Sequence, residues 1–450
     1  MGRLFGTDGA RGVANIELTC ELAMQIGRAA AVVLTKHTNR KPKILIGRDT
    51  RVSSEMLEAA LTAGLCSVGA DAEIIGVIPT PAVAFLVPKY EADAGIMISA
   101  SHNPVEFNGI KLFSNTGYKL PDDVEAEIEA LILDTPEKIE LKKGIELGRV
   151  YKRRSAVSDY VGHIKRSLAI DLTGVSVAVD CANGSASSTA DLLFRELGAD
   201  AHIIHANPNG MNINDKCGST NLDALIYYMK ENGIEVGVAF DGDADRCLAV
   251  DENGNRVDGD QIIAIFARSM KEAGKLNKDT AVITVMSNFG MKRFGRDNGI
   301  QLVSTSVGDR YVLEEMLRND YNLGGEDSGH IILKDFANTG DGQLTAVQLL
   351  QIYKKEGKKL SELAKAMTKS PQVMKCVQAD ADARRNFLLD SEIAGTIQEV
   401  ETALGDDGRV LVRASGTEPL IRVMIEGADY AQINDYCDRI CDTITKRISK

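Results

Sequence analysis

The sequence predicts an α/β protein built from several layered units, and three observations support this fold class. Apolar runs of strand length alternate with stretches whose hydrophobic residues recur at the helical period. The alternation restarts more than once, which is typical of largely parallel sheets covered by helices. The length of 450 residues is more than one hydrophobic core supports. We therefore expect about three domains, within a range of about two to four.

The first unit begins with a strand that ends in charge at residues 43–49 (KILIGRD). A helix is expected over residues 53–69, followed by a strand at 71–76. Pro121 and the acids after it suit the start of a helix over residues 121–133. The charged, weakly periodic segment 134–155 predicts a domain connection, and its basic run Lys152-Arg153-Arg154 favours a solvated face over a binding site.

Two further units of the same kind follow, and the chain ends in a smaller one. Their expected elements are strands at residues 174–180, 234–240, 281–286 and 301–308, and helices beginning near Ser187, beginning near Asp260, around 361–367 and over 428–448. The segment 368–380 is a second candidate boundary. The three larger units could be three versions of one layered unit.

Composition excludes several classes of partner. Lys and Arg number 52 against 64 Asp and Glu, a formal charge of −12 that argues against general binding to nucleic acid or anionic membranes. No stretch approaches the roughly 20 apolar residues of a membrane span, and the N-terminus lacks the apolar core of a signal peptide. We therefore expect a cytoplasmic protein in which local basic groups bind any anionic ligand.

The eight cysteines are scattered along the chain and form no CxxC pair. Their spacing therefore indicates neither a zinc site nor a disulfide framework, and packing is the expected role of all eight. Cys437 and Cys441 lie four residues apart on an expected helix, which leaves a shared role open.

The densest chemical signal is FDGDADRCLAVD, residues 240–251, where three aspartates alternate directly after an apolar strand. In an extended backbone Asp241, Asp243 and Asp245 would share one side and bring their oxygens together. Such a set favours Mg²⁺ or Ca²⁺ over zinc. Glu252 falls at the twelfth position of an EF-hand count, but strands are expected on both sides of the loop. The alternative, a solvated acidic turn, would leave three repelling carboxylates unneutralised.

A polar tip, SASHNP at residues 99–104, follows the apolar run GIMI and ends at a proline. A loop that follows a buried strand can expose a nucleophile on a rigid support, or it can simply turn. No GxSxG elbow is present to activate a serine. A phosphorylated serine could instead share Mg²⁺ with the three aspartates. Ser101, at the tip beside His102, suits that role better than Ser99.

Two stretches combine arginines with polar residues and are candidate anion sites. RASGTEPLIR forms a small-residue turn between two arginines, whose N–H groups and hydroxyls can hold a phosphate. Its candidate ligands are Arg413, Ser415, Gly416, Thr417 and Arg422. GRDTR, residues 47–51, places Arg48 and Arg51 at a strand end, either to bind an anion or to form surface ion pairs.

GGEDSGH, residues 324–330, sets Glu326, Ser328 and His330 among three glycines. This density of donors and acceptors suits a ligand with many hydroxyls, such as a sugar, although a turn with incidental polar residues is the alternative. The chain contains no GxxxxGK[ST], GxGxxG or HExxH, which removes the main support for a P-loop, a dinucleotide site of the usual form and a metalloprotease.

Taken in order, the motifs GTDGARG, GIMISASHNP, DGDADR, GGEDSGH and RASGTEP resemble the α-D-phosphohexomutase superfamily along essentially the whole chain. The start MGRLFGTDGARGVAN, the run SASHNPVEFNGIKLF and the length are most similar to bacterial phosphoglucosamine mutases. The resemblance implies an isomerase that interconverts glucosamine 6-phosphate and glucosamine 1-phosphate, which feeds UDP-N-acetylglucosamine and peptidoglycan precursors.

The resemblance also implies four domains around a central cleft: three with a common mixed α/β layered fold and a C-terminal α+β domain related to the TATA-binding protein. The implied domains are 1–155 (phosphoserine), 156–254 (metal), 255–368 (sugar) and 369–450 (phosphate). A homodimer and a cleft that closes over the sugar phosphate are further implications.

By the same resemblance, Ser101 is a phosphoserine that passes its phosphoryl group to the sugar and takes back the other one from glucosamine 1,6-bisphosphate. Mg²⁺ would be held by that phosphate and by Asp241, Asp243 and Asp245. The implied proton-transfer and charge-stabilising groups are Lys111, Arg11 and His102. The sugar-binding loop would supply Glu326, Ser328 and His330, and the phosphate-binding loop Arg413, Ser415, Gly416, Thr417 and Arg422. Arg246 would either neutralise phosphate or brace the aspartates.

One position departs from the family pattern. Phosphoglucosamine mutases usually read GGEQSGH and phosphomannomutase/phosphoglucomutase relatives carry methionine at the fourth position, whereas this chain has Asp327. An aspartate there would add negative charge near the sugar, compatible with the ammonium of glucosamine, or point to solvent. The alternatives are a phosphomannomutase/phosphoglucomutase and a non-catalytic sugar-phosphate-binding protein. The intact Ser101 and the complete aspartate set argue against the latter.

Overall fold

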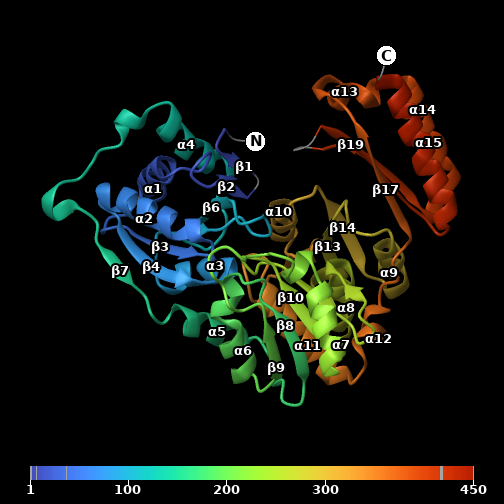
Figure 1. The fold of residues 1–450 in the computed structure, drawn as a ribbon, viewed down its shortest axis with the longest axis horizontal. Helices are drawn as coiled ribbons and strands as arrows, with labels where there is room; N and C mark the ends of the chain where they lie inside the picture. Colours follow the sequence, from blue (N-terminus) through green and yellow to red (C-terminus); the bar gives the residue numbers. More distant parts are fainter. Residues whose placement is uncertain (1–2, 7, 37, 416–418, 449–450) are drawn as a thin grey trace. The chain divides into compact units, whose positions relative to one another are not determined.

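The computed structural model describes residues 3–6, 8–36, 38–415 and 419–448. The chain divides into two compact units (Figure 1). The first unit comprises Met1–Met286 and Ile300–Ala366, and the second comprises Ser287–Gly299 and Met367–Lys450. Three of the four sheets belong to the first unit and one belongs to the second.

The first sheet has seven strands in the order β1-β2-β6-β5-β3-β4-β7. The strands are β1 (Phe5–Gly6), β2 (Gly9–Val13), β3 (Lys43–Arg48), β4 (Asp71–Val77), β5 (Ala94–Ile98), β6 (Phe107–Ser114) and β7 (Val150–Lys152). The β5, β3, β4 and β7 strands are parallel, and β6 joins β5 and β2 antiparallel. Because β3 and β5 are central and fully covered, their apolar runs are nearly continuous.

Helices cover both faces of this sheet. On one face, the core packs α1 (Cys20–Leu34), α2 (Val52–Ser67) and α4 (Asp122–Leu133) against alternate residues of β3 and β5. On the other face lies α3 (Thr80–Lys89), so close that a Cβ on Gly47 or Gly95 would come within 3 Å of the Val83 side chain. The glycines therefore allow α3 to approach the sheet that carries the serine tip.

The second and third sheets also belong to the first unit. The second has the order β12-β11-β10-β8-β9, with β8 parallel to both β9 and β10. Its strands are β8 (Ser176–Asp180), β9 (Asp200–Ile204), β10 (Gly237–Phe240), β11 (Cys247–Val250) and β12 (Arg256–Val257). The third has the order β14-β13-β15-β16, from β13 (Thr280–Thr284), β14 (Gln301–Thr305), β15 (Leu323–Gly325) and β16 (Ile331–Leu333).

The helices between β7 and β17 in the first unit are α5 (Ala156–Arg166), α6 (Ala190–Glu196), α7 (Asp223–Asn232), α8 (Gly259–Glu272), α10 (Asp309–Asn319), α11 (Gly342–Glu356) and α12 (Leu360–Ala364). The side chains of Asp258 and Asp341 cap α8 and α11 by accepting backbone N–H groups of the first turn.

The second unit is an α+β layer with a core of its own. Its antiparallel sheet has the order β17-β19-β18, from β17 (Gln372–Gln378), β18 (Arg409–Ala414) and β19 (Leu420–Glu426). The core packs α14 (Ser391–Leu404) and α15 (Tyr430–Ile448) against this sheet. The unit also contains α9 (Gly290–Asn298) and α13 (Ala381–Asn386).

The mixed α/β class is confirmed, and the differences from expectation lie at element ends and boundaries. The helix expected near Ser187 is a 3-10 turn, Ser185–Ser188, followed by α6. The expected strand at 301–308 ends at Thr305. The connection 134–155 includes β7, which joins the first sheet. The second candidate boundary contains β17, in which Val373 and Val377 lie on the same face and are buried in the C-terminal core.

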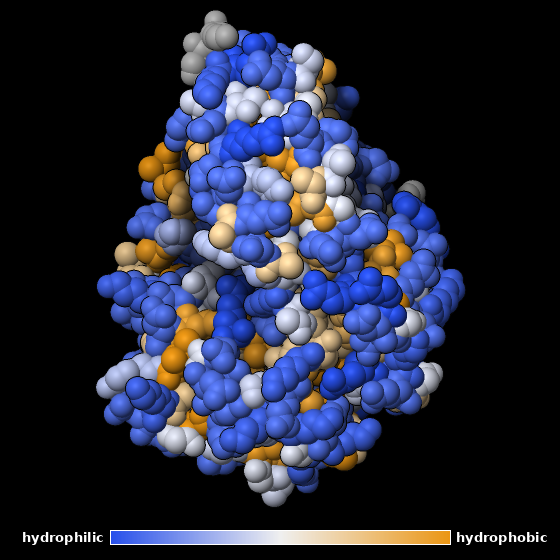
Figure 2. Space-filling view, turned by 90° about the vertical axis from the view of Figure 1, so that its right-hand side faces the viewer, coloured by the Kyte–Doolittle hydropathy of each residue, from blue (hydrophilic) through white to orange (hydrophobic). Residues whose placement is uncertain are grey.

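Among the described residues, no helix is long and apolar enough to cross a membrane. Hydrophilic residues predominate on the face seen in Figure 2, where hydrophobic residues form small separate groups.

Candidate active site

The serine loop, residues 99–104, leaves the end of β5 and turns sharply at Ser101. Ser101 has φ 52°, in the left-handed region that non-glycine residues rarely adopt, and is only 2% exposed. Its N–H donates to Ser99 Oγ at 3.0 Å, and that hydroxyl donates to Asp49 Oδ2 at 2.7 Å. These bonds fix the turn so that the Ser101 side chain leaves the sheet in one direction.

Arg51 stabilises the same loop by hydrogen bonds to its backbone. It is fully buried with Asp49, with 2.8 Å between Nε and Oδ2. Its Nη2 donates to the carbonyl oxygens of Ser101 at 3.0 Å and Asn103 at 2.9 Å. Arg51 is therefore neither an anion ligand nor a surface ion-pair partner. Arg48, the other arginine of GRDTR, forms ion pairs with Glu55 and Glu58.

The acidic loop, residues 241–246, follows β10 and carries three aspartates. Asp241 and Asp243 are fully buried and Asp245 is 4% exposed. One oxygen from each lies within 4.8 Å of the other two. The convergence comes from a turn through Ala244 at φ 57°, not from the extended backbone that the alternating pattern suggested.

The oxygens of this loop are incompletely partnered. Ser101 Oγ donates to Asp241 Oδ2 at 2.5 Å, which joins the two loops. Asp243 Oδ1 and Asp245 Oδ1 are buried and find no hydrogen-bond donor among the described residues. Burial, together with the charges of Asp245 and Asp243, raises the pKa of Asp241 well above its usual range. Three buried oxygen donors with unused lone pairs fit a hard divalent cation.

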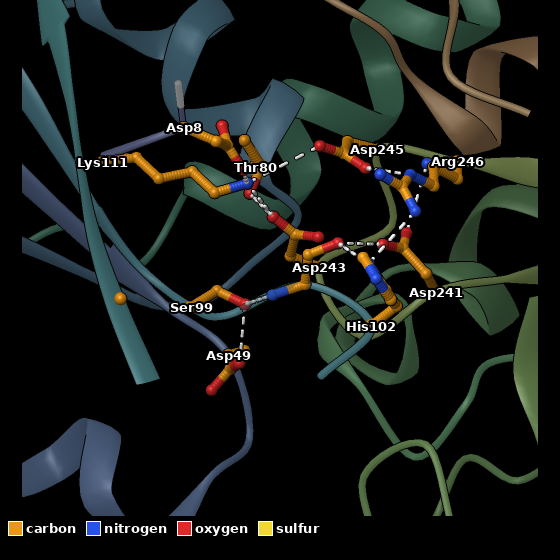
Figure 3. A network of polar contacts seen from close by, with 12 residues as sticks. Asp8, Asp49, Thr80, Ser99, His102, Lys111, Asp241, Asp243, Asp245 and Arg246 are labelled. Atoms are coloured by element: carbon orange, nitrogen blue, oxygen red, sulfur yellow. Dashed lines mark hydrogen bonds and ion pairs between the residues drawn. The ribbon is translucent and has the colours of Figure 1, made fainter. Parts of the chain in front are cut away.

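Lys111 reaches the acidic loop from β6, as Figure 3 shows. Its ammonium is 1% exposed and lies 2.8 Å from Asp243 Oδ2 and 2.9 Å from Asp8 Oδ2. Burial would lower the pKa of Lys111, but Asp243 and Asp8 outweigh it and raise the pKa well above the usual range. The side chain is therefore a fixed positive charge.

His102 and Arg246 lie on the opposite side of the three aspartates from Lys111 (Figure 3). His102 Nδ1 is 3.3 Å from Ser101 Oγ and 3.1 Å from an Arg246 guanidinium nitrogen. Burial and the charges of Arg246 and Arg11 lower the pKa of His102 to about 4. Arg246 Nε lies 3.9 Å from Asp245 Oδ1. The guanidinium of Arg246 therefore contacts both the acidic loop and His102 of the serine loop. Arg11 forms its ion pair with Asp8.

Several polar residues at the site were missed by the sequence analysis. Asp8 lies in the quoted motif GTDGARG and contacts Lys111, Lys119 and Arg11. Lys119 also forms an ion pair with Asp309, with 2.5 Å between Nζ and Oδ2. Thr80, at the start of α3, donates its hydroxyl to Asp243 Oδ2. The motif around Asp8 was a usable signal, whereas nothing local marks Thr80, Lys119 or Asp309.

The GGEDSGH stretch links β15 to β16, and its side chains differ in availability. Ser328 Oγ is buried and finds no partner among the described residues. Glu326 Oε1 accepts Gly308 N–H at 3.0 Å, and burial raises the pKa of Glu326. His330 is 2% exposed, and both ring nitrogens have neighbours: Nε2 accepts Gly340 N–H at 3.1 Å and Nδ1 faces Asp245 at 3.5 Å. His330 therefore supports the acidic loop in this structure.

Asp327 is only partly exposed, and burial is the main reason why its pKa is raised. The negative charge of Asp258 raises this pKa further, whereas Arg256 and Arg246 lower it.

The arginine turn belongs to the second unit. Arg413 in β18 pairs across the sheet with Arg422 in β19. Ser415 N–H donates to Leu420 O at 2.8 Å, and Ser415 O accepts from Arg384 at 3.0 Å. Gly416 and Thr417 lie outside the described residues.

Comparison with known families covers nearly the whole chain. Four domain models of the phosphoglucomutase/phosphomannomutase family match it in order: the α/β/α domain I over residues 2–138, domain II over 158–254, domain III over 258–370 and the C-terminal domain over 353–443. With the sheets described above, these matches give a four-domain α/β fold.

Solved structures share this fold. A phosphoglucomutase/phosphomannomutase family protein from Burkholderia thailandensis superposes with a TM-score of 0.82 at 24% identity, covering 99% of this chain and 98% of the other. The N-acetylphosphoglucosamine mutase of Aspergillus fumigatus, solved in complex with GlcNAc-6P and magnesium, gives 0.67 at 17% identity and covers 100% and 96%.

Sequence relatives are much more similar. The phosphoglucosamine mutase of Acetivibrio thermocellus is 54% identical over 448 residues, with both chains covered completely. That of Clostridium beijerinckii is 52% identical over 447 residues, covering 99% of this chain and 100% of the relative. These full-length matches confirm the resemblance of the five motifs, and the chain belongs to the phosphoglucosamine mutase family of phosphohexomutases.

Proposed function

We propose that the protein interconverts glucosamine 6-phosphate and glucosamine 1-phosphate through a phosphorylated Ser101. One observation carries the proposal: Ser101 Oγ lies 2.5 Å from Asp241 Oδ2, in a cluster of three buried carboxylates. Two of them, Asp243 and Asp245, each have an oxygen that no described residue donates to. A neutral serine needs no such cluster, whereas a phosphoserine beside a divalent cation does. Family membership supports the same reading.

Asp241, Asp243 and Asp245 would hold Mg²⁺ together with a phosphate oxygen on Ser101. When bound, the ion supplies positive charge that stabilises the transferring phosphoryl group. Lys111 adds a second positive charge beside Asp243, fixed by burial and by its raised pKa. Arg246 supplies a third beside His102. Positioned charge is the main requirement of phosphoryl transfer.

In the forward direction the bond between phosphorus and Ser101 Oγ breaks and a bond to the sugar hydroxyl oxygen forms, while the proton of that hydroxyl is transferred through the side chains around the serine to Ser101 Oγ. This yields glucosamine 1,6-bisphosphate. After the bisphosphate reorients, its other phosphoryl group returns to Ser101 and the product leaves. The braced serine loop keeps Oγ in place for both transfers, because the bonds from Arg51 and Ser99 fix its backbone.

We assign the remaining roles by domain: residues 1–155 carry the phosphoserine, 156–254 the metal ligands, 255–368 the sugar site and 369–450 the distal phosphate site. Ser328 Oγ in the sugar loop is buried and has no hydrogen-bond partner among the described residues, so its hydroxyl is available to a ligand. Arg11 adds positive charge to the surroundings of Ser101, and His102, whose pKa is lowered to about 4, adds a neutral imidazole that can accept a proton. The substrate is a small sugar phosphate, and the acidic net charge favours a cytoplasmic protein without nucleic-acid or membrane partners. The family resemblance is the basis for proposing a homodimer.

The test is kcat/KM for glucosamine 1-phosphate, glucose 1-phosphate and mannose 1-phosphate, with Mg²⁺ and a trace of the matching bisphosphate. The proposal expects a large preference for the glucosamine substrate, which disappears in Ser101→Ala. A preference for glucose or mannose would keep the mechanism and move the enzyme to the phosphoglucomutase/phosphomannomutase specificity. Absence of turnover with all three sugars would indicate a sugar-phosphate-binding protein.

A further inference from the structure

A second group of metal-ligating side chains lies at the same edge of the five-stranded sheet as the acidic loop. Asp180 ends β8 and His205 directly follows β9, and these strands are parallel neighbours. Cys217 comes from a separate loop, just before the 3-10 turn Gly218–Thr220. One donor atom from each of the three lies within 4.8 Å of the other two. Carboxyl ends of parallel strands are where α/β folds place their ligands.

The donor types differ from those of the acidic loop. A carboxylate, an imidazole and a thiol form a mixed set that suits zinc, whereas Mg²⁺ takes oxygen ligands. We propose that Asp180, His205 and Cys217 form a binding site for Zn²⁺ or a chemically similar transition-metal ion, separate from the three-aspartate site. Asp180 and Cys217 are fully buried, and the His205 side chain is 31% exposed. The exposed side gives the ion a way in and leaves a fourth position for water.

The backbone around the group holds Asp180 and His205 in place before any ion binds. Asp180 accepts Ala182 N–H at 2.8 Å and Gly218 N–H at 3.0 Å, so its carboxylate is anchored at both neighbouring turns. His205 has φ 46°, and its carbonyl oxygen accepts Asn183 N–H at 2.6 Å. His205 Nδ1 lies 2.9 Å from Asp180 Oδ2, so the two groups need only a small separation to share an ion.

Cys217 would bind the ion as a thiolate. Its Sγ is buried and accepts a hydrogen bond from Asn183 Nδ2 at 3.9 Å. Binding of the ion replaces the thiol proton, which passes to solvent, and leaves a thiolate ligand.

The turns that carry these ligands also support the two catalytic loops. Asn214, three residues before Cys217, donates to Ser101 O at 2.9 Å. Ser185 N–H donates to Gly242 O at 2.8 Å, inside the acidic loop. An ion that ties Asp180, His205 and Cys217 together therefore stabilises the folded form of this region, because it binds the native arrangement and not the unfolded chain.

The test uses Co²⁺ as the probe, added to the full-length protein in saturating Mg²⁺. We expect the near-ultraviolet absorption of a thiolate-to-cobalt charge transfer, removal of that band by Zn²⁺, and a rise in the thermal unfolding midpoint with Zn²⁺. Cys217→Ser should abolish the band, and His205→Ala should weaken Co²⁺ binding at least about 100-fold. Cys181→Ser, a neighbouring buried thiol, and Cys376→Ser, an exposed one, are the matched controls and should keep the band.

A metal-free unfolding curve for Cys217→Ser that matches the parent shows that the variant folds. A protein without a thiolate band, or a band that survives in folded Cys217→Ser, would overturn the proposal. Because the readout is spectroscopic and the three-aspartate site is filled with Mg²⁺, this outcome is independent of whether the mutase reaction is assigned correctly.

Discussion

The serine loop follows β5 and the acidic loop follows β10, and both turn through one residue in the left-handed region, Ser101 at φ 52° and Ala244 at φ 57°. Their stabilisation differs. The serine loop is satisfied internally, because Arg51, Asp49 and Ser99 occupy its polar groups. The acidic loop brings like charges together and contains buried oxygens that no described residue donates a hydrogen bond to.

The difference separates two ways of building a reactive site. The loop that carries the transferable group is rigid in the protein alone, which keeps Oγ in position through two transfers. The loop that binds the cation is left electrostatically strained, so that an ion completes it. Substitutions in the two loops should therefore change activity and stability in different combinations.

Asp241→Asn is expected to give the largest effect on activity. Loss of one carboxylate and of its contact with Ser101 should lower kcat about 10³-fold, the size of several kcal/mol of lost charge stabilisation. Without added metal the same variant should unfold at a higher temperature than the parent, because a crowded buried charge has been removed. Opposite movements of activity and metal-free stability identify a strained cation site, and a fall in both would show that Asp241 is a structural carboxylate.

Arg51→Met should give the largest effect on stability. The change leaves Asp49 buried without its cation and should cost about 3–5 kcal/mol of unfolding free energy. Arg48→Met is the matched control from the same GRDTR stretch. Its partners are Glu55, which is 71% exposed, and Glu58, which is 21% exposed, so the change should cost less, about 1–2 kcal/mol. Urea unfolding followed by circular dichroism measures both. Equal losses would contradict the role given to Arg51.

Gly342→Ala tests how the acidic loop is supported from behind. Gly342, at the start of α11, donates its N–H to Ala244 O at 3.0 Å, and a Cβ there would lie 2.3 Å from Arg246 O. The clash should displace the loop, cost about 1–3 kcal/mol and weaken Mg²⁺ binding measured by calorimetry. Gly395→Ala, on the exposed side of α14 with no atom within 4 Å, should instead gain about 0.5–1 kcal/mol.

Asp341→Asn should give the smallest effect, visible as a pH dependence. Burial raises the pKa of Asp341 to about 6, although Leu344 N–H and Tyr160 hydroxyl bonds oppose the shift. Because the folded pKa exceeds the unfolded value of about 3.9, the folded protein takes up this proton first and gains stability as pH falls from about 7 to about 4.

The free energy of unfolding of the parent should therefore rise relative to Asp341→Asn by about 2 kcal/mol over that interval. A constant difference between the two proteins would mean that Asp341 titrates normally. Asparagine keeps the N-cap, so loss of the cap does not confuse the comparison.

The sequence could predict those parts of the site that consist of contiguous residues. A buried strand followed by SASHNP, and another followed by DGDADR, showed where the two loops would lie. The predicted convergence of the three aspartates is confirmed, but the predicted backbone is wrong, because the chain turns at Ala244 where an extended strand was expected.

The missed features are contacts between distant positions. The contacts run from Lys111 to Asp8, to Lys119 and to Asp309. This series of alternating charges exists only after folding, because the residues lie far apart in the sequence. Asp180, His205 and Cys217 escaped notice for the same reason, since their spacing matches no local metal motif. Arg51 was expected either to bind an anion or to form a surface ion pair, because the burial of its ion pair with Asp49 depends on how the serine loop folds over it.

The most direct test of the account is a single-turnover experiment with enzyme labelled on its phosphoryl group. The protein is loaded from labelled bisphosphate, the label is mapped by peptide mass analysis, and unlabelled glucosamine 1-phosphate is then added with Mg²⁺. The account predicts that the label sits on Ser101, not on Ser99, and moves to the sugar within one turnover. A label elsewhere, or label retained on Ser101 while product forms at the full rate, would contradict it.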